Sequence, residues 1–212
     1  MYRFELNDIH KEDLTKAIEI AKLAHKGQLD KAGRPYFEHV QVVSEIASNI
    51  TLSWEEEYDD FLIKAKIVSY LHDVVEDTLL TMDDLWGFNL PTDCKLAIET
   101  LTKKSGQDYW DYLAEVKLDK LATVVKIADL THNSDLSRLE NVIPEDLARR
   151  DKYLKAIDYL SSYKCAKCGL SGNIIDMGEK SSRSNEILCQ PCLEKYEIEY
   201  DEFEDWLKRE RD

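Results

Sequence analysis

The sequence contains few glycines and prolines, only 7 and 4 among 212 residues. Both residue types interrupt helices, so their scarcity, beside segments rich in Leu, Ala, Lys and Glu, favours an all-α fold. No apolar run approaches the roughly 20 residues of a membrane span, and the N-terminus is polar, unlike a signal peptide. We therefore expect a cytoplasmic protein without a membrane-embedded segment.

Basic residues are outnumbered, since 28 Lys and Arg stand against 43 Asp and Glu, and the formal net charge is −15. A charge of this sign repels nucleic acids and acidic membrane surfaces. An anionic substrate would therefore need a metal ion or a few well-placed cations. The length allows one core domain with an appendage.

Cysteines are also scarce, 5 in total, but four of them form two CxxC pairs near the C-terminus. In a cytoplasmic chain such pairs favour a closed tetrahedral Zn²⁺ site, with redox or unrelated cysteines as the alternative. The composition changes at Tyr163, which predicts three parts: a helical domain at 1–162, a zinc-ribbon-like module at 163–195 and an acidic amphipathic tail at 196–212. The predicted zinc ligands are Cys165, Cys168, Cys189 and Cys192.

Helical periodicity covers most of the first 162 residues. A loop at 27–36 contains two glycines and a proline, so it can approach a ligand closely, and Lys31 and Arg34 are its cations. The predicted helices span 11–25, 36–49, 61–77, 93–101, 109–116, 121–133 and 144–161, with a short one beginning near Thr81.

Polar residues interrupt the apolar faces of three of these helices. The residues are His39, His72, Asp73 and Asp129. Ionised groups on a buried face are costly unless they are paired or bind a metal. If the helices converge, two imidazoles and two carboxylates would suit Mn²⁺, Fe²⁺ or Zn²⁺ and leave positions for water or substrate. Glu76 and Asp77 follow one turn later, where they could activate a water. The alternatives are a polar helix end in solvent and hydrogen-bonded core histidines.

The order of these residues resembles the HD superfamily of metal-dependent phosphohydrolases. The surrounding segments, 24–28, 33–39, 71–78 and 126–133, look like the hydrolase domain of RelA/SpoT-type enzymes. The resemblance implies an HD-domain helical bundle over most of residues 1–162, followed by the added zinc ribbon. Because no synthetase domain follows, the chain is similar in this respect to small stand-alone alarmone hydrolases.

Enzymes of this family remove the 3′-pyrophosphate of guanosine tetra- and pentaphosphate, (p)ppGpp, using Mn²⁺. The resemblance implies that Glu76 and Asp77 activate water, that Lys31 meets substrate phosphates and that Asn133 contacts the nucleotide. It implies GDP or GTP and pyrophosphate as products. The implied ligands of Mn²⁺, or of another divalent metal, are His39, His72, Asp73 and Asp129.

Two positions depart from the family pattern. Asp30 precedes Lys31 where the family usually has consecutive cations, and Leu130 replaces a commonly basic residue. These departures leave open a second hypothesis, an HD hydrolase of another nucleotide or phosphoester. A third is a non-catalytic nucleotide-sensing or adaptor protein, in which the zinc ribbon or the acidic tail engages a protein partner.

Overall fold

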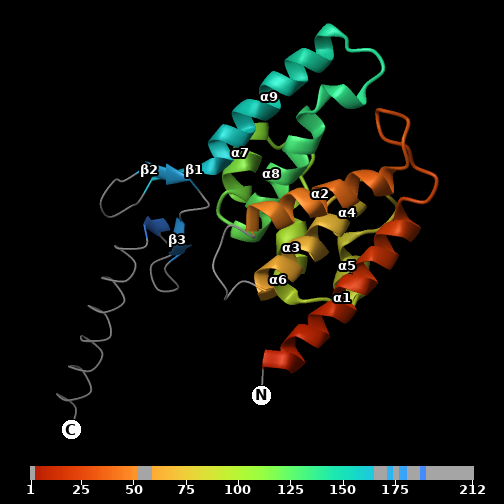
Figure 1. The fold of residues 1–212 in the computed structure, drawn as a ribbon, viewed down its shortest axis with the longest axis vertical. Helices are drawn as coiled ribbons and strands as arrows, with labels where there is room; N and C mark the ends of the chain where they lie inside the picture. Colours follow the sequence, from red (N-terminus) through yellow and green to blue (C-terminus); the bar gives the residue numbers. More distant parts are fainter. Residues whose placement is uncertain (1–2, 52–58, 165–170, 174–176, 181–186, 190–212) are drawn as a thin grey trace, which may run out of the picture. The chain divides into compact units, whose positions relative to one another are not determined.

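The computed structural model describes residues 3–51, 59–164, 171–173, 177–180 and 187–189. The chain divides into two compact units, Met1–Asp158 and Tyr159–Asp212. The helices (Figure 1) are α1 (Arg3–Ala24), α2 (Tyr36–Thr51), α3 (Asp59–Leu71), α4 (Val74–Asp77), α5 (Met82–Gly87), α6 (Thr92–Leu101), α7 (Tyr109–Val116), α8 (Lys120–Ser134) and α9 (Pro144–Ser161), with a short 3₁₀ helix, η2 (Leu136–Arg138).

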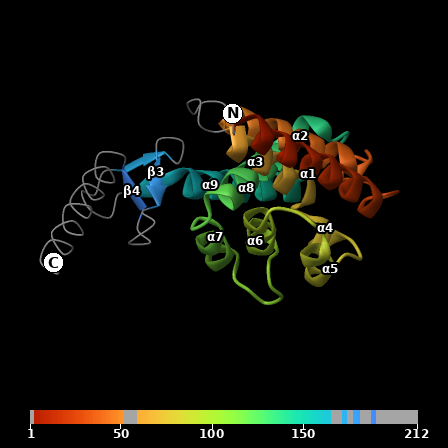
Figure 2. The same ribbon diagram turned by 90° about the horizontal axis from the view of Figure 1, so that it is seen from below.

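Helix α3 is central to the first unit, where it contacts α1, α2, α6 and α8. Figure 2 shows α5, α6 and α7 on one side of the layer that contains α1, α2 and α3. Small buried residues such as Ala21, Ala47 and Ala65 allow these helices to approach closely. The all-α prediction is confirmed for this unit.

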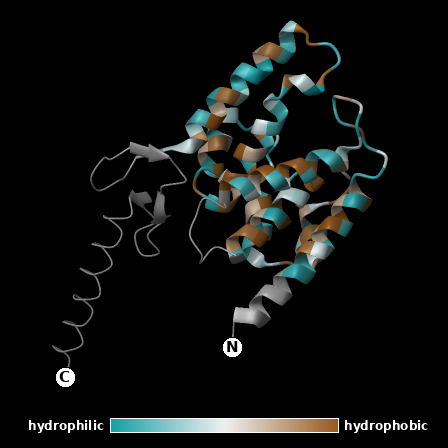
Figure 3. Cartoon of the chain, viewed as in Figure 1, coloured by the Kyte–Doolittle hydropathy of each residue, from teal (hydrophilic) through white to brown (hydrophobic). Residues whose placement is uncertain are grey.

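Hydrophobic residues recur along the long helices, whereas the loop after α1 is largely hydrophilic (Figure 3). None of the described helices combines the length and the apolar character needed to cross a bilayer.

The prediction of one continuous helix over 61–77 is wrong. Helix α3 ends at Leu71, His72 and Asp73 form a turn, and α4 begins at Val74. His72 Nδ1 lies 2.8 Å from the carbonyl oxygen of Ser69, one of the last carbonyls of α3, which lack intrahelical donors. The side chain thus satisfies a backbone group that the helix end leaves free. Periodicity did not reveal the break because both Leu71 and Val74, on either side of it, are fully buried.

The loop between α1 and α2 is closed by Asp30. Its Oδ1 accepts hydrogen bonds from the backbone N–H groups of Ala32 and Arg34, each at 2.9 Å. Gly33 has φ +75°, a conformation that side chains disfavour. The loop therefore has a defined shape and presents Lys31 at the surface.

The second unit begins with the last residues of α9, and its other described residues form two antiparallel strand pairs. Strand β1 (Ser162–Lys164) pairs with β2 (Ser171–Asn173), and β3 (Met177–Lys180) pairs with β4 (Ile187–Cys189). Cys189 ends β4. The other three predicted zinc ligands, Cys165, Cys168 and Cys192, lie outside the described residues, as does the predicted tail at 196–212.

Candidate metal centre and adjoining cavity

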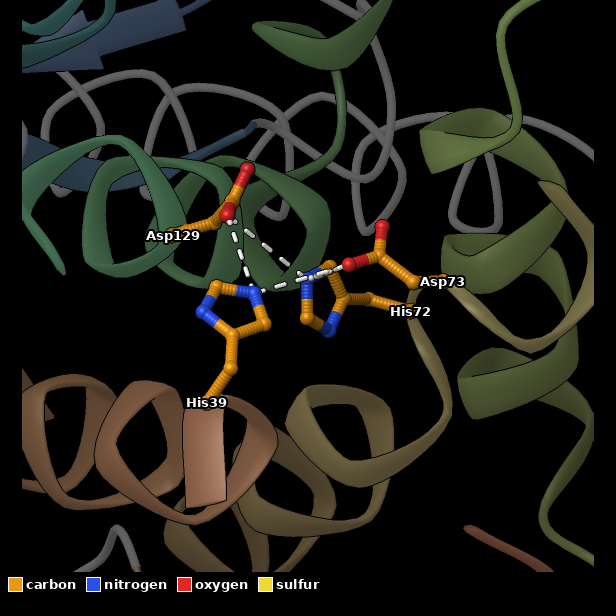
Figure 4. Close-up of side chains that lie close together, drawn as sticks. All are labelled: His39, His72, Asp73 and Asp129. Atoms are coloured by element: carbon orange, nitrogen blue, oxygen red, sulfur yellow. Dashed lines mark ion pairs between the residues drawn. The ribbon is translucent and has the colours of Figure 1, made fainter. Parts of the chain in front are cut away.

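Four polar side chains meet in the core of the first unit (Figure 4). They come from α2, from the turn between α3 and α4, and from α8, and are His39, His72, Asp73 and Asp129. One potential ligand atom of each lies within 4.8 Å of the others. His39 Nε2 is 3.5 Å from Asp73 Oδ2 and 3.4 Å from Asp129 Oδ1. The structure therefore brings together the four residues predicted as metal ligands.

The donor atoms of this cluster suit a divalent cation. The Nδ1 of His72 is engaged with the Ser69 carbonyl, so a neutral ring carries its lone pair on Nε2. That nitrogen is buried and has no hydrogen-bond partner among the described residues, although it lies 2.9 Å from Asp73 Oδ2. A buried nitrogen without a donor, beside carboxylates, is what a metal ligand requires.

The charges of the cluster depend on one another. Burial alone would lower the pKa of His72, but the carboxylates of Asp73 and Asp129 raise it to about 10. Burial would raise the pKa of Asp73, and the charge of His72 outweighs it, so the pKa is lowered. The imidazole and the carboxylates thus favour each other's charged forms. A divalent ion would supply positive charge in place of the imidazolium and release protons.

The predicted water-activating acids lie in α4. Glu76 Oε1 accepts a hydrogen bond of 2.6 Å from the backbone N–H of Lys103, and burial raises the pKa of Glu76. The hydroxyl oxygen of Tyr36 is 2.9 Å from Asp77 Oδ2 and 2.6 Å from Asp73 Oδ2. A phenol has one proton, so it donates to one carboxylate at a time. Tyr36 therefore connects Asp77 to Asp73 of the cluster.

A cavity of about 370 Å³ adjoins this cluster, and His39, Tyr36 and Asp77 form part of its wall. Both predicted substrate residues, Lys31 and Asn133, also line it. The Asn133 amide donates to Asp129 Oδ1 at 2.6 Å, so it contacts the cluster as well as the cavity.

The cavity also contains residues that the sequence did not indicate. Arg149 and Tyr153 come from α9, four residues apart and hence on one face, and Arg138 comes from η2. The cluster residues were recognisable in the sequence because they interrupt apolar helix faces. These three residues do not interrupt such a face, so the sequence did not indicate them. Together they add two guanidinium groups and an aromatic ring to a lining that also contains the acids Asp30, Asp77 and Asp135. Guanidinium groups and a ring are features that can contact an anionic ligand with an aromatic base.

The two departures from the family pattern have structural roles. The carboxylate of Asp30 is used by the backbone of its own loop, and its Oδ2 lies 3.6 Å from Arg138 Nη2. Leu130 is 2% exposed and belongs to the core. Asp30 therefore lines the cavity as a paired acid.

No family model matches the sequence. A guanosine-3′,5′-bis(diphosphate) 3′-pyrophosphohydrolase of Haemophilus influenzae is 28% identical over 124 residues, covering 54% of this chain and 17% of the relative. The bifunctional (p)ppGpp synthase/hydrolase SpoT of Escherichia coli is 27% identical over 130 residues, covering 57% and 17%. The chain therefore spans 17% of the length of these curated relatives.

A solved structure of a metazoan SpoT ortholog, which its title describes as hydrolysing ppGpp, matches with a TM-score of 0.52. The match covers 77% of this chain and 89% of that one at 22% sequence identity. At this identity the likeness establishes a shared fold.

Proposed function

From the relationship of this chain to RelA/SpoT-type (p)ppGpp hydrolases, we propose that it hydrolyses the 3′-pyrophosphate of guanosine tetra- and pentaphosphate. The observation that carries the proposal is the buried cluster of two histidines and two aspartates beside a cavity whose lining includes Lys31, Arg138 and Arg149. Hydrolysis adds water across the bond between the ribose 3′-oxygen and phosphorus. GDP or GTP and pyrophosphate are the products.

We propose Mn²⁺, or another divalent ion, as the cofactor. Its ligands would be His39, His72, Asp73 and Asp129. Imidazole and carboxylate ligands suit such ions, and a bound ion supplies Lewis acidity and lowers the pKa of a water. The repulsion between a polyphosphate and an acidic protein would also be reduced at this point.

Glu76 and Asp77 are proposed to accept the proton of the attacking water. The raised pKa of Glu76 brings it closer to neutrality, which favours a general base. The Lys103 N–H fixes one Glu76 oxygen and leaves the other available. The hydroxyl of Tyr36 holds Asp77 on the side of the cluster.

Substrate binding is assigned to the cavity residues. Lys31 and Arg149 provide charge for the phosphates, and Asn133 provides an amide for the nucleotide. The ring of Tyr153 provides a surface for stacking of the base.

A screen of phosphorylated nucleotides, including guanosine tetraphosphate, tests this function. Purified full chain loaded with Mn²⁺ is expected to turn over substrates that carry a 3′-pyrophosphate, and Glu76→Gln is expected to be slower by about 10²- to 10⁴-fold. The matched control is Glu99→Gln, which alters an exposed glutamate on α6. A preference for nucleotides without a 3′-pyrophosphate would instead favour another phosphoester substrate. Turnover of none by metal-loaded protein would favour a sensing or adaptor role.

We also propose a Zn²⁺ site in the second unit, supported by the spacing of its CxxC pairs. The ligands would be Cys165, Cys168, Cys189 and Cys192. The division at 1–162, 163–195 and 196–212, the cytoplasmic location and a protein partner for the ribbon or tail stay predictions from the sequence.

A further inference from the structure

His39 directs Nε2 toward the two aspartates of the cluster (Figure 4). An imidazole that binds a cation through Nε2 carries its proton on Nδ1, and this proton needs an acceptor. The Nδ1 of His132 lies 2.7 Å from the Nδ1 of His39. The ring centroids are 4.9 Å apart and the planes are inclined by 22°, so the rings lie edge to edge and nearly in one plane, as a hydrogen bond between the two nitrogens requires.

His132 lies on α8, three residues after Asp129, so the helix that supplies one proposed metal ligand also supports another. Its ring nitrogen faces the Nδ1 of His39, on the other side of that ring from the cluster. His132 is not among the residues whose ligand atoms converge. It is placed to act through His39.

The position of His132 depends in turn on Arg138. The guanidinium Nη1 of Arg138 lies 2.7 Å from His132 Nδ1 and 2.5 Å from His132 Nε2, so it contacts both ring nitrogens, and the Arg138 side chain is only 14% exposed. Its Nη2 lies 3.6 Å from Asp30 Oδ2. Because Asp30 is fixed by the backbone of the loop that contains Lys31, these contacts connect that loop to His39.

We propose that His132 is a positioning residue for His39, whose Nδ1–H it accepts, and that Arg138, anchored by Asp30, holds the His132 ring in place. The proposal rests on the part of the proposed function that makes His39 a metal ligand. It gives Asp30 a role that a cation at this position could not fill, because a cation would repel Arg138. The same contacts couple the substrate loop to the metal centre.

The first test measures Mn²⁺ affinity of the full chain without nucleotide, from the electron paramagnetic resonance signal of free Mn²⁺. We expect His132→Leu to weaken binding by about 10- to 100-fold. His132→Asn places an amide oxygen near the position of Nδ1 and is expected to bind much more tightly than His132→Leu. Asp129→Asn defines the background binding of this acidic chain, and Thr131→Ala, an exposed position on α8, is the matched control.

The outcomes separate this inference from the proposed hydrolysis. Wild-type affinity in a folded His132→Leu variant, or equal losses in the Leu and Asn variants, would overturn the positioning role, whatever the substrate. Absence of hydrolysis by Mn²⁺-loaded wild type would overturn the proposed function alone. Thermal melting of each metal-free variant identifies losses that come from unfolding.

The second test addresses the Asp30–Arg138 pair. If Asp30 acts through Arg138, Asp30→Asn and Arg138→Met should each weaken Mn²⁺ binding, and the double variant should be no weaker than Arg138→Met alone. If the losses of Mn²⁺ binding free energy in the two single variants add up in the double variant, Asp30 does not act through Arg138. Unchanged affinity in both single variants would remove the pair from the proposal.

Discussion

Lys126 Nζ lies 2.9 Å from Oδ2 of Asp129, and the two side chains are only 14% and 7% exposed. Lys126 thus contacts one carboxylate oxygen of Asp129, and the other oxygen, Oδ1, lies 3.4 Å from His39 Nε2. Since Lys126 and Asp129 are three residues apart on α8, the helix itself fixes their alignment. A buried lysine thus orients one of the proposed metal ligands.

Replacing Lys126 by methionine should destabilise the metal-free protein. Removing one partner of a buried pair leaves an uncompensated charge, which typically costs about 3–5 kcal/mol of unfolding free energy. Excess Mn²⁺ should recover part of this loss because it supplies positive charge to Asp129. Urea denaturation followed by helical circular dichroism measures both values.

The control for this change is Lys155→Met, at an exposed position on α9. A surface substitution of this kind usually changes stability by no more than about 0.5 kcal/mol. A loss equally small in Lys126→Met would show that the buried pair does not orient Asp129.

Metal binding should stabilise the wild-type fold. A ligand that binds only the folded state adds about 2.7 kcal/mol at 100 times its Kd. We expect Mn²⁺ to produce this increase in wild type and in Asp111→Asn, an exposed control on α7, but not in Asp129→Asn. If Asp129→Asn gained as much stability as wild type, Mn²⁺ would be binding elsewhere.

Glu76→Gln should separate metal binding from catalysis. Loss of a general base lowers kcat by about 10²- to 10⁴-fold, whereas Mn²⁺ affinity should be unchanged because Glu76 is outside the cluster. Steady-state kinetics with guanosine tetraphosphate, together with Mn²⁺ titration, measures the two quantities. A parallel loss of both would make Glu76 a metal ligand instead.

The raised pKa of Glu76 also predicts how the activity and the stability of the wild-type protein depend on pH. The base must be ionised, so kcat should fall as the pH drops through a value above that of an ordinary glutamate. The pKa of Glu76 is higher in the folded protein than in the unfolded chain. The contribution of Glu76 to the free energy of unfolding is therefore complete at a pH below the unfolded pKa. It is lost as the pH rises through the folded pKa. Glu76→Gln should remove this pH-dependent change in stability, which urea denaturation at several pH values measures. The same change in the variant would show that it does not come from Glu76.

The CxxC pairs predict a second, independent metal. Purified chain should retain about one Zn²⁺ after mild chelation removes the ion from the histidine–aspartate cluster. A Cys165→Ser/Cys168→Ser variant should lose this zinc and still bind Mn²⁺. Elemental analysis measures both, and loss of both metals together from a folded chain would contradict two separate sites.

The sequence predicted most where the signal lies within one helix. Helices α7 and α9 have the bounds that the sequence predicted. The start of α7 is fixed by Asp108, whose side chain accepts a hydrogen bond of 2.7 Å from the backbone N–H of Trp110. The four cluster residues were found because each interrupts an apolar face. These features depend on local spacing and burial, which a single sequence records.

Contacts between helices were not predictable in the same way. His132 and Tyr36 bear on the cluster only because α8 and the start of α2 pack beside each other, and Arg138 reaches His132 from η2. The sequence shows Asp30 only as a departure from consecutive cations, whereas the structure pairs it with Arg138 at 3.6 Å. Such relationships depend on packing, which periodicity does not encode.

Product analysis with guanosine 3′,5′-bis(diphosphate) is the direct assay of the proposed hydrolysis. Purified full chain with Mn²⁺ is incubated with this nucleotide, and products are separated by anion-exchange chromatography. We expect equal amounts of GDP and pyrophosphate from wild type and from Glu99→Gln, and at least about 100-fold less of both from Glu76→Gln in the same time. Intact nucleotide after incubation with protein shown to hold Mn²⁺ would contradict the proposed hydrolysis.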